Sequence, residues 1–237
     1  MADALVIVPT YNEAESLSAL VGRLRQHMPA ADVLIVDDGS PDGTGRIADE
    51  LATADGGITV LHRTRKEGLG RAYLAGFRHG LSAGYDYLVE IDADGSHDPA
   101  ELVPMLALAR GGADLVLGSR WITGGSVVNW PWPRRAISRF GNAYARTMLG
   151  SRIRDLTSGY RVYRSGALDG IRFDTIASHG YGFQIELAWT LERTGRTVLE
   201  HPITFIERAA GRSKMHLGIV LEALARVTAW GLTRRRG

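Results

Sequence analysis

The sequence predicts an α/β fold in which helices cover both faces of a mostly parallel central sheet. Short apolar runs alternate with segments of helical spacing through the first 120 residues. The apolar runs are continuous, which is typical of parallel strands that are buried on both faces. The chain of 237 residues is 45% hydrophobic, which suits one large domain with a substantial core.

Strands and helices are expected to alternate up to residue 120. Each predicted strand is a short apolar run, and each predicted helix places apolar residues three or four positions apart, as Leu17, Leu20, Val21 and Leu24 do. The predicted strands are 4–8, 32–36, 58–63, 85–91 and 113–120, and the predicted helices are 13–28, 44–54, 68–83 and 99–110.

The pattern loosens after residue 120. The expected elements are a loop rich in Gly, Trp and Pro at 121–135, a helix at 136–149, a short strand or loop unit at 155–164, a helix at 182–195, a strand and then a loop at 198–214, and an amphipathic helix with a basic end at 216–237. We therefore expect one domain at 1–210. The end of the last loop and the C-terminal amphipathic helix follow at 211–237.

Composition excludes several classes of function. The chain has no cysteine, which excludes disulfides, zinc–thiolate sites and a cysteine nucleophile. A formal net charge of +2 is too small for a dedicated nucleic-acid binder, but it is compatible with a local basic patch for phosphates or an anionic membrane. The N-terminus lacks the basic region of a signal peptide, and no run of about 18 apolar residues predicts a transmembrane helix.

Acidic residues gather after the fourth predicted strand. Asp98 is expected to cap a helix, with Pro99 at the first helical position and Glu101 at the third. Asp92 and Asp94 precede this cap and, two residues apart in an extended segment, can face one cleft. Carboxylates so close repel each other unless a cation lies between them, and Mg²⁺ takes one or two carboxylates together with substrate phosphates. The segment indicates a metal–diphosphate site, with a solvated acidic turn as the alternative.

Two further strand ends carry polar groups at the edge where parallel sheets bind ligands. Asp37 and Asp38 end the second strand, and turn chemistry is the alternative explanation for them. After the first strand, Tyr11 offers a ring for a nucleotide base and Glu13 offers acceptors, and the alternative is a helix entry capped by Asn12. The glycine fingerprint of dinucleotide sites and the P-loop motif are both missing from the sequence. Together the strand ends predict a nucleotide site built from acids and a metal.

Six segments occur in order along the chain, namely VPTYNE, VDDGSPDGT, DADGSHDP, GSRW, LTSGYRVYR and ERAAGRSK. Together they closely resemble the inverting family 2 glycosyltransferases of the Rossmann-like GT-A fold, over about residues 4–215. Within that family they are most similar to polyprenol-phosphate (dolichol-phosphate) mannose synthases. The resemblance implies transfer of mannose, with inversion, from GDP-mannose to a polyprenyl monophosphate, with Mg²⁺ or Mn²⁺ as cofactor.

The resemblance also implies a role for each matching residue at the nucleotide. Pro9, Tyr11 and Glu13 would line the guanosine pocket. Val36 and Asp38 would contact the base and the ribose.

The same resemblance assigns the metal and its neighbours. Asp92, Ala93 and Asp94 form a D-x-D segment that would hold the metal and the sugar nucleotide. Ser96 stands where some members of the family place a glutamine ligand. A hydroxyl is a shorter and weaker ligand than an amide, so either Ser96 binds the metal directly or a water lies between them.

Basic residues complete the implied site. Arg120 and Arg134 would face the diphosphate or the acceptor phosphate, and Arg208 and Lys214 would lie on a loop that closes over the donor phosphates. A phosphate acceptor is anionic at neutral pH and needs no general base, so catalysis would rest on electrostatics, with Asp94, Arg120 and Arg134 as the catalytic residues.

A lipid acceptor implies contact with a membrane surface, on its cytoplasmic face. Trp121, Trp130 and Trp132 beside arginines are typical of a membrane interface, and so is the basic C-terminal helix; core packing or a dimer contact is the alternative. The resemblance adds a separate membrane-anchoring protein as a partner and gives no role to nucleic acid. Alternative functions are transfer from UDP-glucose or another sugar nucleotide, and a non-catalytic nucleotide-sugar-binding module.

Overall fold

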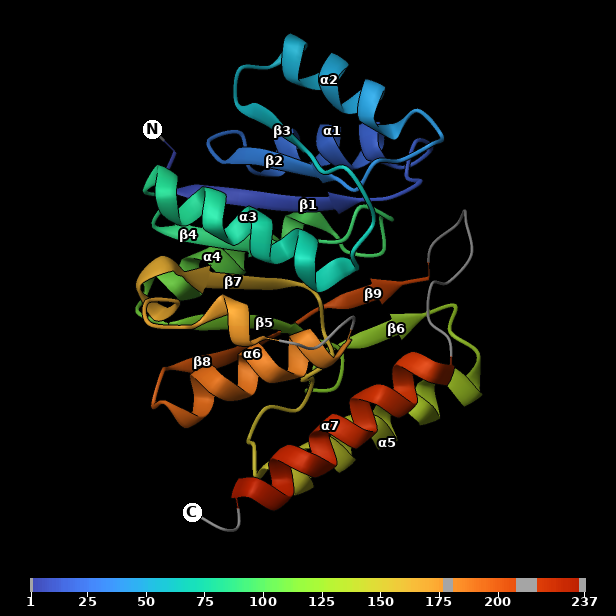
Figure 1. Ribbon diagram of the computed structural model, residues 1–237, viewed down its shortest axis with the longest axis vertical. Coiled ribbons are helices and arrows are strands. Elements are labelled where there is room, and N and C mark those ends of the chain that lie inside the picture. Colours follow the sequence, from blue (N-terminus) through green and yellow to red (C-terminus); the bar gives the residue numbers. More distant parts are fainter. Residues whose placement is uncertain (1, 177–180, 208–216, 235–237) are drawn as a thin grey trace.

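The computed structural model describes residues 2–176, 181–207 and 217–234 (Figure 1). Its strands are β1 (Ala4–Thr10), β2 (Asp32–Asp37), β3 (Ile58–His62), β4 (Tyr87–Glu90), β5 (Leu115–Ser119), β6 (Ser126–Val128), β7 (Arg161–Arg164), β8 (Val198–Pro202) and β9 (Thr204–Ile206). Seven of them form one sheet in the order β3-β2-β1-β4-β7-β5-β8, and β6 pairs with β9. Only β7 runs antiparallel to its neighbours in the large sheet, so the predicted mostly parallel α/β architecture is confirmed.

Helices lie on both faces of this sheet. They are α1 (Leu17–His27), α2 (Thr44–Ala54), α3 (Leu69–Ala83), α4 (Leu102–Arg110), α5 (Trp132–Leu149), α6 (Tyr181–Arg193) and α7 (Leu217–Arg234), with short 3₁₀ turns at Pro99–Glu101, Ser165–Ala167 and Phe173–Thr175. In β1, Leu5 and Ile7 join the core cluster of α3 and α6, whereas Val6 and Val8 join the cluster of α1 and α4. Both faces of the strand are therefore buried, which explains why its apolar run is unbroken.

Two helix starts differ from the prediction by four residues. Helix α1 begins at Leu17, four residues later than expected, because the amides of Ser16 and Leu17 both donate to the Glu13 carbonyl in a preceding turn. Asn12 lies before that turn with φ of 57°, and the helix cap is Ser16, so the alternative with Asn12 as the cap was wrong. Helix α5 begins at Trp132, inside the predicted loop, because a proline in the first turn costs no intrahelical hydrogen bond.

The C-terminal helix packs on the rest of the fold. The Tyr144 hydroxyl of α5 lies 2.6 Å from the Thr228 hydroxyl of α7, and the rings of Trp189 and Trp230 stack with centroids 6.1 Å apart. Figure 1 shows α5 and α7 side by side at the margin of the molecule, away from the large sheet. Among the helices that the structure describes, none is both long and apolar enough to cross a bilayer. The boundary at residue 210 stays a prediction.

Candidate active site

The carboxyl ends of β1, β2 and β4 meet at one edge of the sheet. Strand β1 lies between the other two, and the register pairs Thr10 with Asp37 and Ile7 with Glu90. The strand order reverses here, because β2 and β3 lie on one side of β1 and β4 lies on the other, and parallel α/β sheets bind ligands at such a point. The structure therefore places the three polar strand ends of the sequence beside one another.

The two acids that follow β2 differ in their surroundings. Asp37 is buried, and its carboxylate accepts hydrogen bonds from the hydroxyls of Thr10 at 3.0 Å and Ser40 at 2.6 Å and from the Ser40 amide at 3.1 Å. Turn chemistry accounts for Asp37. Asp38 is also buried and pairs with the Arg63 guanidinium at 2.7 Å. Burial raises the pKa of Asp38, with Arg63 acting in the opposite direction.

The predicted nucleotide-binding residues of β1 and β2 lie side by side. Pro9 is paired in register with Val36, and both are buried at the ends of their strands. Tyr11 follows them, and the Lys66 ammonium lies 4.1 Å from the centre of its ring. The Glu13 backbone amide donates a hydrogen bond to the Thr44 hydroxyl at 2.9 Å. Base and ribose binding by these residues stays a prediction.

The D-x-D segment leaves β4 at the same edge. The Asp92 side chain is 32% exposed, and Ala93 between the two acids is buried. Asp94 accepts a hydrogen bond from the Ser96 amide at 3.0 Å, which folds the chain back toward the acids. The Ser96 hydroxyl is buried and has no hydrogen-bond partner within the described part of the chain.

Asp98 has the structural role that the sequence predicted. Its carboxylate accepts a hydrogen bond from the Ala100 amide at 2.9 Å, and Pro99 occupies the first position of the following 3₁₀ turn. It also pairs with Arg23 of α1 at 2.8 Å. This acid therefore caps the 3₁₀ turn that leads into α4.

His97 lies behind the acids as a buried, neutral side chain. Its ring packs against Tyr160 and Phe205, with centroids 4.7 and 5.1 Å away, and its Nε2 lies 3.9 Å from Asp92 Oδ2. Burial lowers the pKa of His97 to about 4, against the attraction of Asp94. A neutral imidazole in this position lies against the D-x-D segment from its protein side.

A buried polar network under the D-x-D segment was missed by sequence reasoning. Glu90 and Arg161 face each other across the antiparallel pair of β4 and β7 with 0% exposure, and 4.0 Å separates their closest atoms. Arg161 donates to the carbonyls of Ser158, Gln184 and Leu156 at 2.7–2.8 Å. Burial raises the pKa of Glu90 to about 7, and Arg161 opposes this rise. In the sequence Glu90 is the next-to-last residue of the predicted strand 85–91, and no local pattern indicates its partner.

Arg120 forms a second buried pair. Its Nε and Nη2 donate to the two oxygens of Asp155, each at 2.7 Å, and its backbone amide donates to the same carboxylate at 3.0 Å. Burial alone would raise the pKa of Asp155, but the Arg120 charge and its hydrogen bonds hold that pKa below its usual range. Asp155 is therefore the buried partner of Arg120.

The remaining predicted basic residues are paired or lie outside the described residues. Arg134 forms an ion pair with Glu207, and its guanidinium lies 4.2 Å from the centre of the Trp130 ring. Trp130 is buried and Trp121 is partly buried, so in this structure both rings pack against the protein instead of facing a membrane. Arg208 and Lys214 lie in 208–216, outside the described residues.

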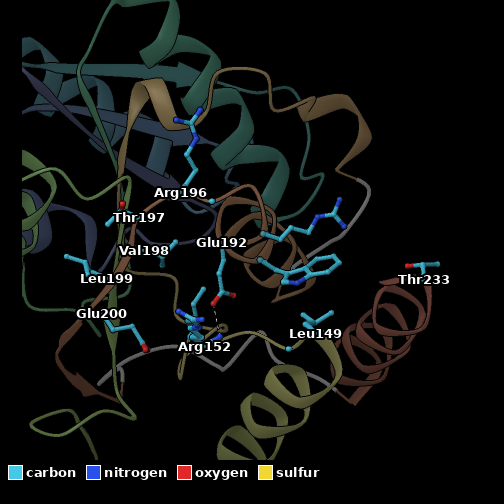
Figure 2. Close-up of a pocket in the computed structure, with 14 residues that line it drawn as sticks. Leu149, Arg152, Glu192, Arg196, Thr197, Val198, Leu199, Glu200 and Thr233 are labelled. Atoms are coloured by element: carbon cyan, nitrogen blue, oxygen red, sulfur yellow. Dashed lines mark hydrogen bonds between the residues drawn. The ribbon is translucent and has the colours of Figure 1, made fainter. Parts of the chain in front are cut away.

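A cavity of about 1070 Å³ lies elsewhere, where β8 meets the C-terminal ends of α5, α6 and α7 (Figure 2). Leu149, Arg152, Trp189 and Glu200 are among the side chains that surround it, and Glu192 accepts a hydrogen bond from the Arg152 amide. The described residues that line it do not include a predicted site residue. The cavity is therefore separate from the strand-end site.

The chain is similar to known glycosyltransferases. The sequence profile described as "Glycosyl transferase family 2" matches residues 5–172. An undecaprenyl-phosphate mannosyltransferase of Micrococcus luteus is 55% identical, with 98% of this chain and 95% of that protein covered. A polyprenol monophosphomannose synthase of Mycolicibacterium smegmatis is 52% identical, with 98% of this chain and 88% of that protein covered.

A solved structure shows the same fold at lower identity. A mannosyltransferase from Pyrobaculum calidifontis, in complex with GDP-Man and Mn²⁺, is 19% identical and superposes with a TM-score of 0.60. The alignment covers 89% of this chain and 58% of that chain. The likeness supports the GT-A fold that the sequence predicted.

Proposed function

Because the chain belongs to glycosyl transferase family 2, we propose that it transfers mannose from GDP-mannose to a polyprenyl monophosphate with inversion at the sugar. Two relatives that are more than half identical over nearly the whole chain bear the names of polyprenyl-phosphate mannosyltransferases. The product would be a β-mannosyl phosphoryl polyprenol. The observation that carries the proposal is the D-x-D segment beside the ends of β1 and β2.

The residues of this segment fit a divalent cation. Asp92 and Asp94 offer hard carboxylate oxygens, and the buried Ser96 hydroxyl beside them has no other partner in the described part of the chain. No group of three acidic or imidazole side chains forms a metal cage among the described residues, which suits Mg²⁺ or Mn²⁺ because these ions complete their coordination with substrate phosphates and water. When bound, the ion would offset the charge that develops on the GDP leaving group.

The transfer itself needs no general base from the protein. An oxygen of the acceptor phosphate is already anionic, and it forms a bond to the anomeric carbon as the bond from that carbon to the β-phosphate oxygen of GDP breaks. Neutral His97 is therefore not required to take a proton. The task left to the protein is to hold two anions in line at one site.

Arg120 and Arg134 remain the arginines proposed to meet these phosphates. In the structure each is paired with a carboxylate, Asp155 and Glu207 respectively. A phosphate would therefore share or replace that carboxylate as the partner. Arg134, on the more exposed pair, can exchange partners at a lower desolvation cost than Arg120, whose pair is almost fully buried.

The assay for this function is formation of a mannolipid. Purified protein is incubated with labelled GDP-mannose, Mn²⁺ and undecaprenyl phosphate, and the lipid fraction is extracted. We expect a labelled product in the wild type and a large loss in Asp94→Ala. Absence of a mannolipid in the wild type, or full activity in Asp94→Ala, would contradict the proposal.

We further propose that α5 brings the site to the membrane surface where the acceptor lies. Trp132 and Phe140 are 78% and 67% exposed, and Ile137 between them is also exposed. The helix has four arginines and no acidic residue, and Arg135 and Arg139 lie on its exposed surface. Exposed aromatic and aliphatic side chains beside arginines are typical of helices that lie in the interface of anionic lipids.

Vesicle flotation tests this contact. Trp132→Ser with Phe140→Ser should weaken binding to vesicles that contain phosphatidylglycerol, whereas Val103→Ser, which removes an exposed apolar side chain from α4, should not. Equal flotation of the α5 variant and the wild type would refute the role of α5. A chain that ends near residue 214 shows separately whether α7 contributes.

A further inference from the structure

We propose that Tyr73 of α3 is a positioning residue that holds Asp92 in the orientation in which it binds the metal. This inference rests on the proposed metal–nucleotide function of the D-x-D segment. The Tyr73 hydroxyl donates a hydrogen bond to Asp92 Oδ1 at 3.1 Å. Tyr73 does not reach the substrate itself, because its side chain is fully buried.

The ring of Tyr73 is fixed by its neighbours. It stacks with Phe183 of α6, with the ring centroids 6.4 Å apart and 6° between the planes, and it lies at the same distance from Phe77 one turn along α3. Rings packed in this way leave the hydroxyl little freedom to follow a moving carboxylate. The hydrogen bond therefore joins Asp92 to a rigid part of the core.

Glycines bring α3 close enough for this contact. A Cβ on Gly76 would lie 2.5 Å from Ile7 of β1, and one on Gly80 would clash with Leu88 of β4. A Cβ on Gly70 would lie 3.0 Å from Phe183. Because these positions carry no side chain, α3 can lie directly on the strands. Its fifth residue, Tyr73, then reaches Asp92 just beyond the end of β4.

A hydrogen bond on one oxygen limits rotation of a ligand carboxylate, so the carboxylate is already oriented when a cation arrives. This orientation favours cation binding, and loss of such an outer partner typically lowers metal affinity by about 10- to 100-fold.

The test variant, Tyr73→Phe, removes only the hydroxyl group that bonds to Asp92. Mn²⁺ binding is measured by electron paramagnetic resonance in the presence of GDP for the wild type, Tyr73→Phe, Tyr85→Phe and Asp94→Ala. Tyr85→Phe is the matched control because its hydroxyl also donates to a carboxylate, that of Asp32, at 2.7 Å, but at the opposite end of the sheet. Melting temperature and GDP binding without metal report on folding.

We expect Mn²⁺ affinity to fall by about 10-fold or more in Tyr73→Phe and to change by less than about twofold in Tyr85→Phe. GDP binding without metal should match the wild type in both variants. If Tyr73→Phe binds Mn²⁺ like the wild type while Asp94→Ala loses it, the role of Tyr73 is refuted and the metal site stands. If Asp94→Ala also binds Mn²⁺ like the wild type, the D-x-D metal site and the positioning role are both overturned.

Discussion

Replacing Asp155 by asparagine removes the negative partner of a buried guanidinium. The carboxylate accepts three hydrogen bonds from Arg120, two from the side chain and one from the backbone, and the two side chains are 0% and 6% exposed. Asparagine has one acceptor oxygen, and its amide group would place a second donor against the guanidinium. A buried charge that loses its partner typically costs about 3–5 kcal/mol of stability.

The matched control is an exposed pair with the same geometry. Arg110 also uses Nε and Nη2 to bind Asp3, but the two side chains are 51% and 38% exposed. Asp3→Asn should therefore cost no more than about 1 kcal/mol. In thermal unfolding followed by circular dichroism, Asp155→Asn should lower Tm by about 6–20 °C for a chain of this size. A loss below about 1 kcal/mol for Asp155→Asn would refute the account of this pair as a buried charge held by its partner.

Three further outcomes follow from the same contacts. The pKa of Asp155 is lowered in the folded state, so the stability from its pair is fully present above the unfolded pKa of about 3.9 and is lost as pH falls through the lower folded pKa. The difference in unfolding free energy between the wild type and Asp155→Asn should therefore shrink between pH 5 and pH 3. A constant difference over this range would contradict the pairing. Gly76→Ala places a methyl group on Ile7 and should cost about 1–3 kcal/mol in urea unfolding, whereas Gly22→Ala, with nothing within 4 Å, should stabilise by about 0.4–1 kcal/mol. Ser96→Ala should raise the Mn²⁺ concentration for half-maximal activity by less than Asp94→Ala does, and an unchanged value would exclude Ser96 as a ligand.

The strand ends could be predicted because their signals are local. A continuous apolar run followed by acids shows where a parallel strand stops, and parallel strands bring such ends to one edge. For this reason Tyr11, Asp38 and Asp92 were expected together. The cap at Asp98 also depends only on the residues that follow it, and the structure confirms it.

The buried contacts around the site could not be predicted because they depend on packing between distant segments. Glu90 meets Arg161 only because β7 enters the sheet antiparallel beside β4, and no periodicity in the sequence reveals that insertion. Asp155 meets Arg120 across 35 residues. Tyr73 has the spacing of a core residue on a helix, and only the close approach of α3 to the strands shows that its hydroxyl ends at Asp92.

The loop at 121–135 was predicted from its composition alone, and composition does not show which way an aromatic ring points. Trp130 is buried against Phe205 and Arg134, whereas Trp132, two residues later, starts a helix and is exposed. The proposed membrane contact therefore moves from the loop to the outer surface of α5. Helical periodicity from Trp132 onward is the signal that places Phe140 on the same surface.

Transfer of mannose from a guanosine nucleotide can be measured by comparing two donors on one acceptor. Purified protein, Mn²⁺ and undecaprenyl phosphate are incubated in parallel with labelled GDP-mannose and with labelled UDP-glucose, and the label in the lipid fraction is counted. We expect a labelled lipid from GDP-mannose that releases mannose on mild acid hydrolysis, and little or no labelled lipid from UDP-glucose. Equal or greater transfer from UDP-glucose would contradict it.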